Sequence, residues 1–85
     1  MKIIKTEDFN QALKKLPKGI QGLYRAQEQI FQSNWRDSRL HTKKVKSLAS
    51  VFSFRITRNY RVLFYFQHAA AAILFEVDHR KDVYR

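Results

Sequence analysis

The chain has 85 residues, of which 17 are Lys or Arg and 7 are Asp or Glu, so its formal net charge is +10. This length allows one domain with one hydrophobic core, which we place over residues 1–85. The absence of cysteine excludes disulfides, thiolate nucleophiles and cysteine metal sites, and it fits a reducing cytoplasm. The charge favours RNA or DNA as the partner over a membrane, because no basic stretch has a continuous apolar face. A basic but inert surface is the alternative.

The first third of the chain predicts a strand followed by two helices. Residues 2–5 are typical of a short strand. Thr6 can cap a helix over residues 7–16, since two acids follow it where the helix dipole favours them. Pro17 stops this helix and can open a second one, which extends to residue 33, so that the two helices form an antiparallel hairpin.

The segment 34–49 has no clear period and contains the basic run Lys43, Lys44 and Lys46. We interpret it as an ordered connection around the helices, because a structureless loop of that length is unusual in a compact domain. The lysines are either a solvated surface or, since they precede the sheet edge, the extension of a phosphate-binding track. Trp35 is interpreted as a core or rim anchor rather than as a platform for base stacking.

The second half predicts three strands, over residues 51–57, 60–66 and 71–77. Apolar and polar residues alternate in the first, while the second is almost wholly apolar and is therefore expected at the centre of the sheet. The element order β-α-α-β-β-β predicts an α+β fold, in which an antiparallel sheet carries the helix hairpin on one face.

The alternation also predicts a binding surface on the sheet face that the helices leave open. Arg55 and Arg61 flank a tight turn at Arg58 and Asn59, so their guanidinium groups are expected side by side. Two guanidinium groups on an open sheet face can bind a phosphate backbone, and Tyr65 adds a stacking surface. A solvated outer face is the alternative interpretation.

The end of the chain gathers groups that move protons and groups that hold phosphate. His79 and Tyr84 carry an imidazole and a phenol, and Arg80, Lys81 and Arg85 carry cations. Because these residues follow the third strand of the same sheet, we expect them to join the arginine pair. The sequence has no metal-ligand spacing and no glycine-rich phosphate loop, so a nuclease built here would use side chains alone, without a metal.

Two segments of the sequence resemble the RelE/ParE superfamily, the toxin halves of type II toxin–antitoxin pairs. One is the strand-turn-strand segment 52–64, whose second strand opens with Tyr-Arg-Val, and the other is the closing His-Arg-x-x-Val-Tyr at residues 79–84. The resemblance includes the order of elements along the whole chain. It implies a RelE-like fold and a ribosome-dependent mRNA endonuclease, which inhibits translation by cutting the codon in the ribosomal A site through attack of the mRNA 2′-hydroxyl.

The resemblance also implies roles for individual residues. Arg61 and Arg80 match the phosphate-stabilising arginines of the family, and Tyr84 matches the tyrosine that orients or stacks on the substrate. Arg55 stands where many members have a lysine or arginine, and His79 is the candidate base or acid. The implied partners are a cognate antitoxin, the ribosome and mRNA, with no small-molecule cofactor. The expected RNA-binding residues are Lys43, Lys44, Lys46, Arg58, Tyr65, Lys81 and Arg85.

One departure from the family concerns Ser53, which stands where members with a lysine pair have a cation. The identity of the general base is therefore left open. Two alternatives also stay open: a ParE-like inhibitor of DNA gyrase, whose relatives generally lack the terminal motif, and a non-catalytic module that binds nucleic acid or an antitoxin.

Overall fold

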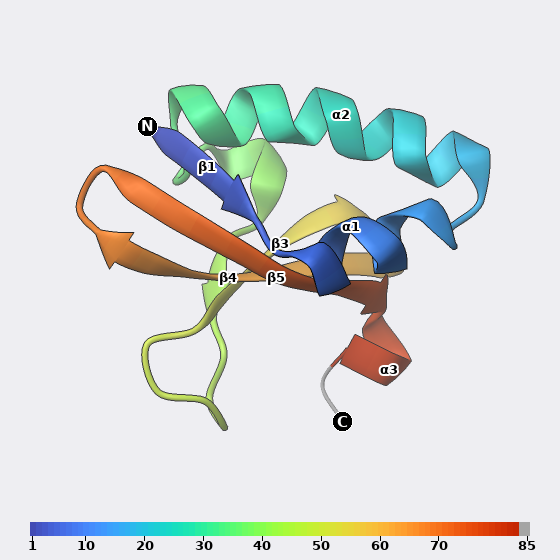
Figure 1. Cartoon of the computed structure of the whole chain (residues 1–85). Coiled ribbons are helices and arrows are strands. Elements are labelled where there is room, and N and C mark those ends of the chain that lie inside the picture. The colour runs from blue at the N-terminus through green and yellow to red at the C-terminus, as the bar shows by residue number, and fades with distance from the viewer. Residues whose placement is uncertain (84–85) are drawn as a thin grey trace.

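A five-stranded sheet with the strand order β1-β5-β4-β3-β2 forms the centre of the fold (Figure 1). The computed structural model describes residues 1–83, and Tyr84 and Arg85 lie outside the described residues. The elements in chain order are β1 (Lys2–Lys5), α1 (Glu7–Lys14), α2 (Lys18–Ser33), the 3₁₀ helix η1 (Ser38–Leu40), β2 (Lys43–Lys44), β3 (Phe52–Thr57), β4 (Tyr60–His68), β5 (Ala71–His79) and α3 (Arg80–Val83).

The α+β fold class is confirmed, but the sheet is mixed and not purely antiparallel. β1 lies parallel to β5, with Ile3 opposite Ala72. These two strands are far apart in sequence and are not connected by a hairpin, so they need not be antiparallel. Ala71 and Ala72 are fully buried at this pairing, which gives the alanine run a packing role.

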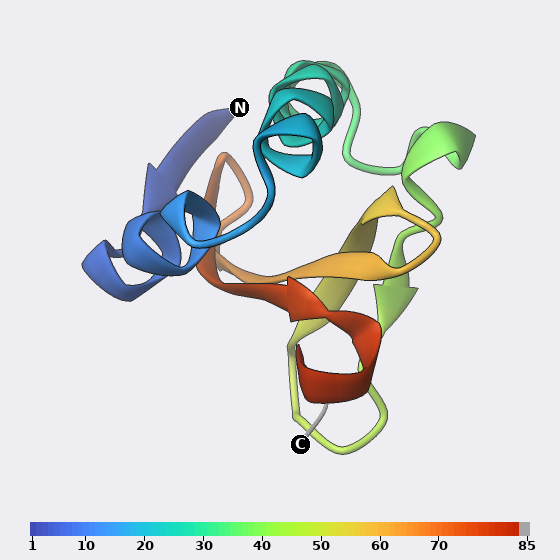
Figure 2. The same cartoon turned by 90° about the vertical axis from the view of Figure 1, so that its right-hand side faces the viewer.

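The helices α1 and α2 cover one face of the sheet, here called the inner face (Figure 2). The Thr6 hydroxyl accepts a hydrogen bond from the Phe9 amide at 3.1 Å, as expected of a helix N-cap. α1 ends at Lys14, earlier than predicted, and Pro17 is the N-cap of α2 rather than its first residue. No helix within residues 1–83 is long and apolar enough to cross a membrane.

Aromatic rings fill the space between α2 and the inner face. Phe31 stacks on Phe54 with ring centroids 4.8 Å apart and meets Phe64 edge-on at 4.7 Å. All three rings are fully buried, and each contributes roughly 2–3 kcal/mol through burial. Phe52 and Ile56 also belong to this core, so the predicted alternation of β3 is confirmed. The core therefore fixes the two strands whose opposite face carries the candidate site.

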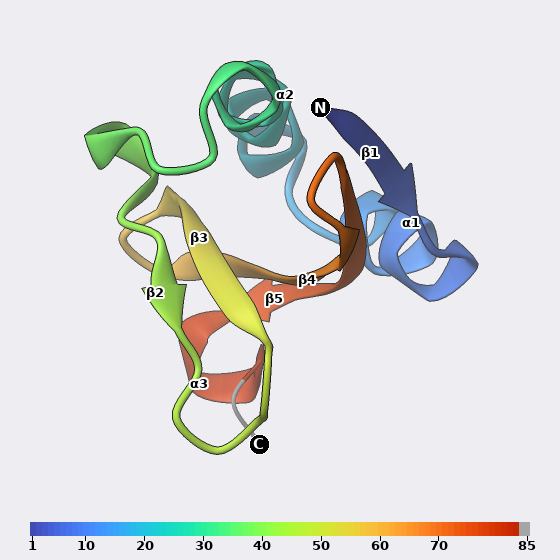
Figure 3. The same ribbon diagram turned by 90° about the vertical axis from the view of Figure 1, so that its left-hand side faces the viewer.

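The opposite face, here called the outer face, is partly covered, and the prediction of a helix-free face is wrong. α3 lies on the other side of the sheet from α2 (Figures 1 and 3), and its Val83 packs with Val45 and Leu63 in a second cluster. The only sequence signal for this helix is one apolar residue in a charged tail, because a four-residue helix is too short to show a period.

A polar network joins α2 to β1. The Lys5 ammonium lies 2.7 Å from a Glu28 carboxylate oxygen, which also accepts a 2.6 Å hydrogen bond from the Tyr24 hydroxyl. Burial, and then the bond to Glu28, raises the pKa of Tyr24. Burial alone would raise the pKa of Glu28, but the bonds from Lys5 and Tyr24 outweigh it and hold that pKa below its ordinary value.

Glu28→Gln is expected to destabilise the protein by about 1 kcal/mol near pH 7, because a partly exposed ion pair is lost. Since the folded-state pKa of Glu28 is lowered, its contribution is present above the ordinary value of 4.5 and disappears as the pH falls through the folded value. Urea unfolding of both proteins, near pH 7 and near pH 3, measures the effect. A difference in unfolding free energy that is the same at both pH values would contradict this account.

Candidate nucleic-acid interface

A row of charged residues crosses the outer face next to the β3–β4 turn. Arg55 of β3 pairs with Arg61 of β4, which in turn pairs with Asp78 of β5. Directly opposed residues of antiparallel strands project to the same face, so the three side chains are neighbours. The predicted adjacency of the two arginines is confirmed, and Asp78 is an acidic neighbour that the sequence analysis did not place there.

The side chain of Arg61 stabilises the β3–β4 turn, which directly precedes it in the chain. Its Nη1 donates hydrogen bonds to the carbonyl oxygens of Thr57 at 2.9 Å and Arg58 at 2.6 Å, and the residue is only 8% exposed. Carbonyl groups in a tight turn have few strand partners, and bonds from a charged donor are stronger than neutral ones. Arg61 therefore has a structural task at the turn that sequence reasoning missed.

Arg55 has a buried donor without an acceptor. Its Nε atom is shielded from solvent and has no hydrogen-bond partner among the described residues. Leaving a buried donor unpaired costs about 1–3 kcal/mol, and more when the donor is charged. A guanidinium group held in this way beside a second arginine is suited to an anionic ligand that brings the missing acceptor.

The start of α3 is bound to the same turn. The Arg80 amide donates a 2.7 Å hydrogen bond to the carbonyl oxygen of Asn59, and Arg80 itself is exposed. The structure therefore brings the backbone of Arg80 to the turn that the Arg61 side chain stabilises.

His79 lies on the other face of the sheet from the arginine pair. It is opposite Tyr60, an inner-face residue, and their ring centroids are 5.4 Å apart. Its Nδ1 accepts a hydrogen bond from the Lys81 amide at 3.2 Å. Neighbouring positions of a strand point to opposite faces, so the register that places Asp78 with Arg61 directs His79 away from them. The structure does not bring His79 together with Arg55 and Arg61.

The basic run lies at the edge of the same face. The edge strand β2 pairs Lys43 with Ser53, which is buried, so the Lys43 side chain projects from the outer face. A cavity of about 340 Å³ opens there, and its lining residues are Lys43, Lys44, Val45, Lys46, Ser47 and Ser53. Lys43 thus lies on the strand next to Ser53, the position where the family resemblance leads us to expect a cation.

The remaining candidates are more widely spread. Arg58 and Lys81 are exposed. Tyr65 is 38% exposed and packs on Phe75, and it lies four residues from Arg61 along β4, or about 13 Å. The predicted contacts by Tyr84 and Arg85 lie outside the described residues. Within residues 1–83, no group of three or more His, Asp or Glu side chains is placed to hold a metal ion.

Several solved structures share this fold. The RelB–RelE antitoxin–toxin complex from Methanococcus jannaschii contains a chain that is 26% identical, with a TM-score of 0.78 over 95% of this chain and 94% of that chain. The RelBE2 toxin–antitoxin complex from Mycobacterium tuberculosis contains one that is 28% identical, with a TM-score of 0.68 over 95% and 92%. The YoeB/ParE toxin from Agrobacterium tumefaciens is 12% identical, with a TM-score of 0.77 over 94% and 99%, which is a likeness of fold alone.

The mixed sheet with two helices on its inner face is therefore the RelE-like fold. Two of the similar chains also exceed one quarter sequence identity over nearly the full length of both proteins. The chain is thus similar to toxins of the RelE/ParE superfamily in fold and, for these two relatives, in sequence. It matches no protein-family model and no curated protein.

Arg61→Met and Arg55→Met remove the same group from paired positions and are expected to act differently on stability. Arg61→Met leaves turn carbonyl groups unpaired and should lower the free energy of unfolding by about 1–3 kcal/mol. Arg55→Met removes an unpaired donor and a like-charged neighbour, so the free energy of unfolding should stay the same or rise. Urea unfolding of the three proteins measures both effects, and equal losses in the two variants would refute the distinction.

Proposed function

We propose that this protein is the toxin of a type II toxin–antitoxin pair and acts as a ribosome-dependent, metal-independent mRNA endonuclease. The similarity to RelE toxins in fold and sequence supports a toxin, and the net charge of +10 supports a polyanionic target. The single observation that carries the nuclease proposal is the unpaired, buried Nε donor of Arg55 beside Arg61 on the outer face. Such a donor is suited to a phosphate oxygen.

The proposed reaction cuts the codon in the ribosomal A site and so inhibits translation. The 2′-oxygen attacks the adjacent phosphorus while the bond from phosphorus to the 5′-oxygen breaks. A base takes the 2′-hydroxyl proton, and an acid gives a proton to the leaving 5′-oxygen. Negative charge increases on the phosphate oxygens, and cations that are already in place stabilise it. In this proposal Arg55 donates to a phosphate oxygen, Arg80 approaches from the turn and Arg61 adds a fixed charge.

Tyr84 and His79 are the proposed proton-transfer groups. Tyr84 follows Val83, which packs on Leu63 of the outer face, and we assign to Tyr84 the orientation or stacking of the substrate and help with proton transfer. His79 lies beside Tyr60 on the inner face, so it serves as base or acid only if the RNA passes around the β3–β4 turn. This position makes His79 the weaker of the two assignments.

The proposed partners are a cognate antitoxin, the ribosome and mRNA, all in the cytoplasm. RelB–RelE and RelBE complexes are among the structures with this fold, which supports an antitoxin. RNA contacts beyond the cleavage site are assigned to side chains of the basic run, the turn and the tail. They are Lys43, Lys44, Lys46, Arg58, Lys81 and Arg85, with Tyr65 as a more distant stacking group.

The placement of His79 favours one alternative, a protein that binds its target without cutting RNA. Near the turn, the described outer face offers guanidinium groups, which are poor bases, the buried Ser53, and the carboxylate of Asp78, which already accepts a 2.7 Å hydrogen bond from the His79 amide. A non-catalytic binding module or a ParE-like inhibitor of gyrase needs no proton carrier at this place. Inhibition of DNA supercoiling by purified protein, without cleavage of mRNA, identifies the second of these.

Arg55→Met and Arg80→Ala are each expected to reduce mRNA cleavage in cells by about 100-fold or more, because each removes a donor to the transition state. Growth after induction and mapping of cut sites within ribosome-bound codons measure the loss. The matched control is Arg25→Met, which removes the same charge from the exposed surface of α2 and should leave cleavage intact. Undiminished cleavage by Arg55→Met would show that the outer face is not the catalytic site.

A further inference from the structure

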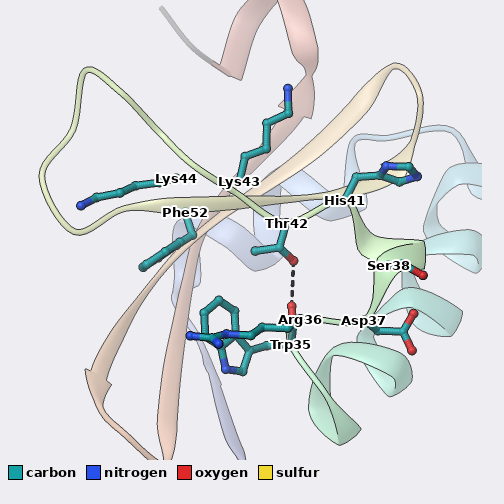
Figure 4. Close-up of a pocket in the computed structure, with 9 residues that line it drawn as sticks. All are labelled: Trp35, Arg36, Asp37, Ser38, His41, Thr42, Lys43, Lys44 and Phe52. Atoms are coloured by element: carbon teal, nitrogen blue, oxygen red, sulfur yellow. Dashed lines mark hydrogen bonds between the residues drawn. The ribbon is translucent and has the colours of Figure 1, made fainter.

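A basic and aromatic pocket lies on the segment that joins α2 to β3, apart from the arginine pair (Figure 4). Its volume is about 360 Å³, near the lower end of the roughly 300–1,000 Å³ typical of small-ligand pockets. A pocket of this size suits a single nucleotide unit better than a large cofactor. The lining residues are Trp35, Arg36, Asp37, Ser38, His41, Thr42, Lys43, Lys44 and Phe52.

The indole ring of Trp35 is held firmly in this pocket. Phe66 meets it edge-on with ring centroids 4.9 Å apart, and Phe52 does so at 5.6 Å. The Thr42 hydroxyl donates a 2.7 Å hydrogen bond to the Trp35 carbonyl oxygen, which fixes the backbone at the same place (Figure 4). The predicted anchoring of Trp35 at the rim of the core is thus confirmed, and a role in base stacking, which the sequence did not favour, is compatible with this anchoring.

A cation covers the same ring. The guanidinium carbon of Arg36 lies 4.7 Å from the centroid of the Trp35 ring, and the Arg36 residue is exposed. A cation–π contact at an exposed position is weaker than the stacking of a nucleobase on an aromatic ring. A base can therefore replace the guanidinium group on the indole, and the released guanidinium group then has an adjacent phosphate within reach.

The pocket favours an anionic ligand. Its one carboxylate, Asp37, is held by Arg39 through bonds of 3.0 and 2.9 Å from the guanidinium group. These bonds lower the pKa of Asp37 to about 2, so this carboxylate stays ionised and paired. The charges of Arg36, Lys43 and Lys44 are thus not offset by Asp37.

We propose that this pocket binds one unpaired nucleobase of a single-stranded RNA, stacked on Trp35, with Arg36 and Lys44 on the flanking phosphate. An RNA strand fits better than a free nucleotide, because Lys43 and Lys44 also line the cavity on the outer side of β2. The row of cations therefore extends around the edge of the sheet and is long enough to contact more than one phosphate of a strand. The choice of RNA rests on the proposed function, but the stacking is measurable separately from cleavage.

Trp35 is the only tryptophan in the chain, so its fluorescence reports the pocket directly. The purified protein is titrated with a 2′-O-methyl hexanucleotide, which cannot be cleaved, and with an abasic backbone of the same length and charge. Stacking predicts quenching by the hexanucleotide and little or none by the abasic backbone. Equal quenching by the two, or binding of the hexanucleotide without quenching, overturns the proposal.

Arg36→Ala is expected to weaken binding of the hexanucleotide by roughly fivefold, because a phosphate contact is lost. Arg25→Ala is the matched control, since it removes an exposed charge from α2, outside the pocket. If both variants weaken binding equally, Arg36 contributes only through the net charge of the protein, and its assignment to the flanking phosphate is overturned. Quenching without mRNA cleavage in cells would refute only the proposed function, whereas cleavage without quenching would refute only the pocket.

The base can belong to mRNA or to ribosomal RNA, and crosslinking distinguishes these sources. A benzoylphenylalanine in place of Ser38, an exposed lining residue, is irradiated with ribosomes that carry mRNA. Crosslinks to mRNA or to ribosomal RNA support the pocket and identify its source. Crosslinks to ribosomal protein alone, or none, overturn the proposal that RNA occupies it.

Discussion

The candidate site depends on the hydrogen bonds that converge on the β3–β4 turn. Arg61 donates to the carbonyl oxygens of Thr57 and Arg58 and, at a longer distance, of Tyr60, and the Arg80 amide donates to the carbonyl oxygen of Asn59. One short turn thereby positions the end of β3, the start of β4 and the start of α3. Because a guanidinium group stays protonated at all ordinary pH values, the hydrogen bonds from Arg61 to the turn do not change with pH. Each cation that we assign to phosphate binding near the turn depends on it for its place.

The same turn accounts for the chemical character of the outer face. Like charges directly opposite one another in a sheet are destabilising, so the pair Arg55 and Arg61 needs a compensating gain. Arg61 obtains one from the turn carbonyl groups, whereas the Nε of Arg55 obtains none within residues 1–83. The two arginines look alike in the sequence, yet the structure gives Arg61 a structural role and leaves the Nε of Arg55 without an acceptor among the described residues. The unpaired Nε of Arg55 is expected to lower the stability of the folded protein.

The face of β3 was predictable from its period-two alternation, whereas the pairing of Arg55 with Arg61 also depends on a register shift between Arg55 and Thr57, which the sequence does not show. The face of the sheet on which His79 lies was not predictable, because it depends on the register of β5 against β4. That register shifts after Leu63, so that Leu74 and Val77 share the inner face despite their odd spacing. α3 and β2 are too short to show a period, and they lie where Val83 of α3 and Val45, which follows β2, pack on Leu63. The pocket around Trp35 was not predictable, because the segment 35–44 that lines it has no clear period and its fold against Phe52 is not visible in the sequence.

We infer that the Arg55 Nε–H group is unpaired until a phosphate binds. The most direct test follows the arginine Nε–H signals of the folded protein by NMR during titration with a short, uncleavable RNA. The account predicts that the Arg55 signal moves downfield and becomes protected from solvent exchange as its hydrogen bond forms, while the Arg61 signal changes little. A stationary Arg55 signal at saturating RNA, with shifts confined to other cations, would contradict the account.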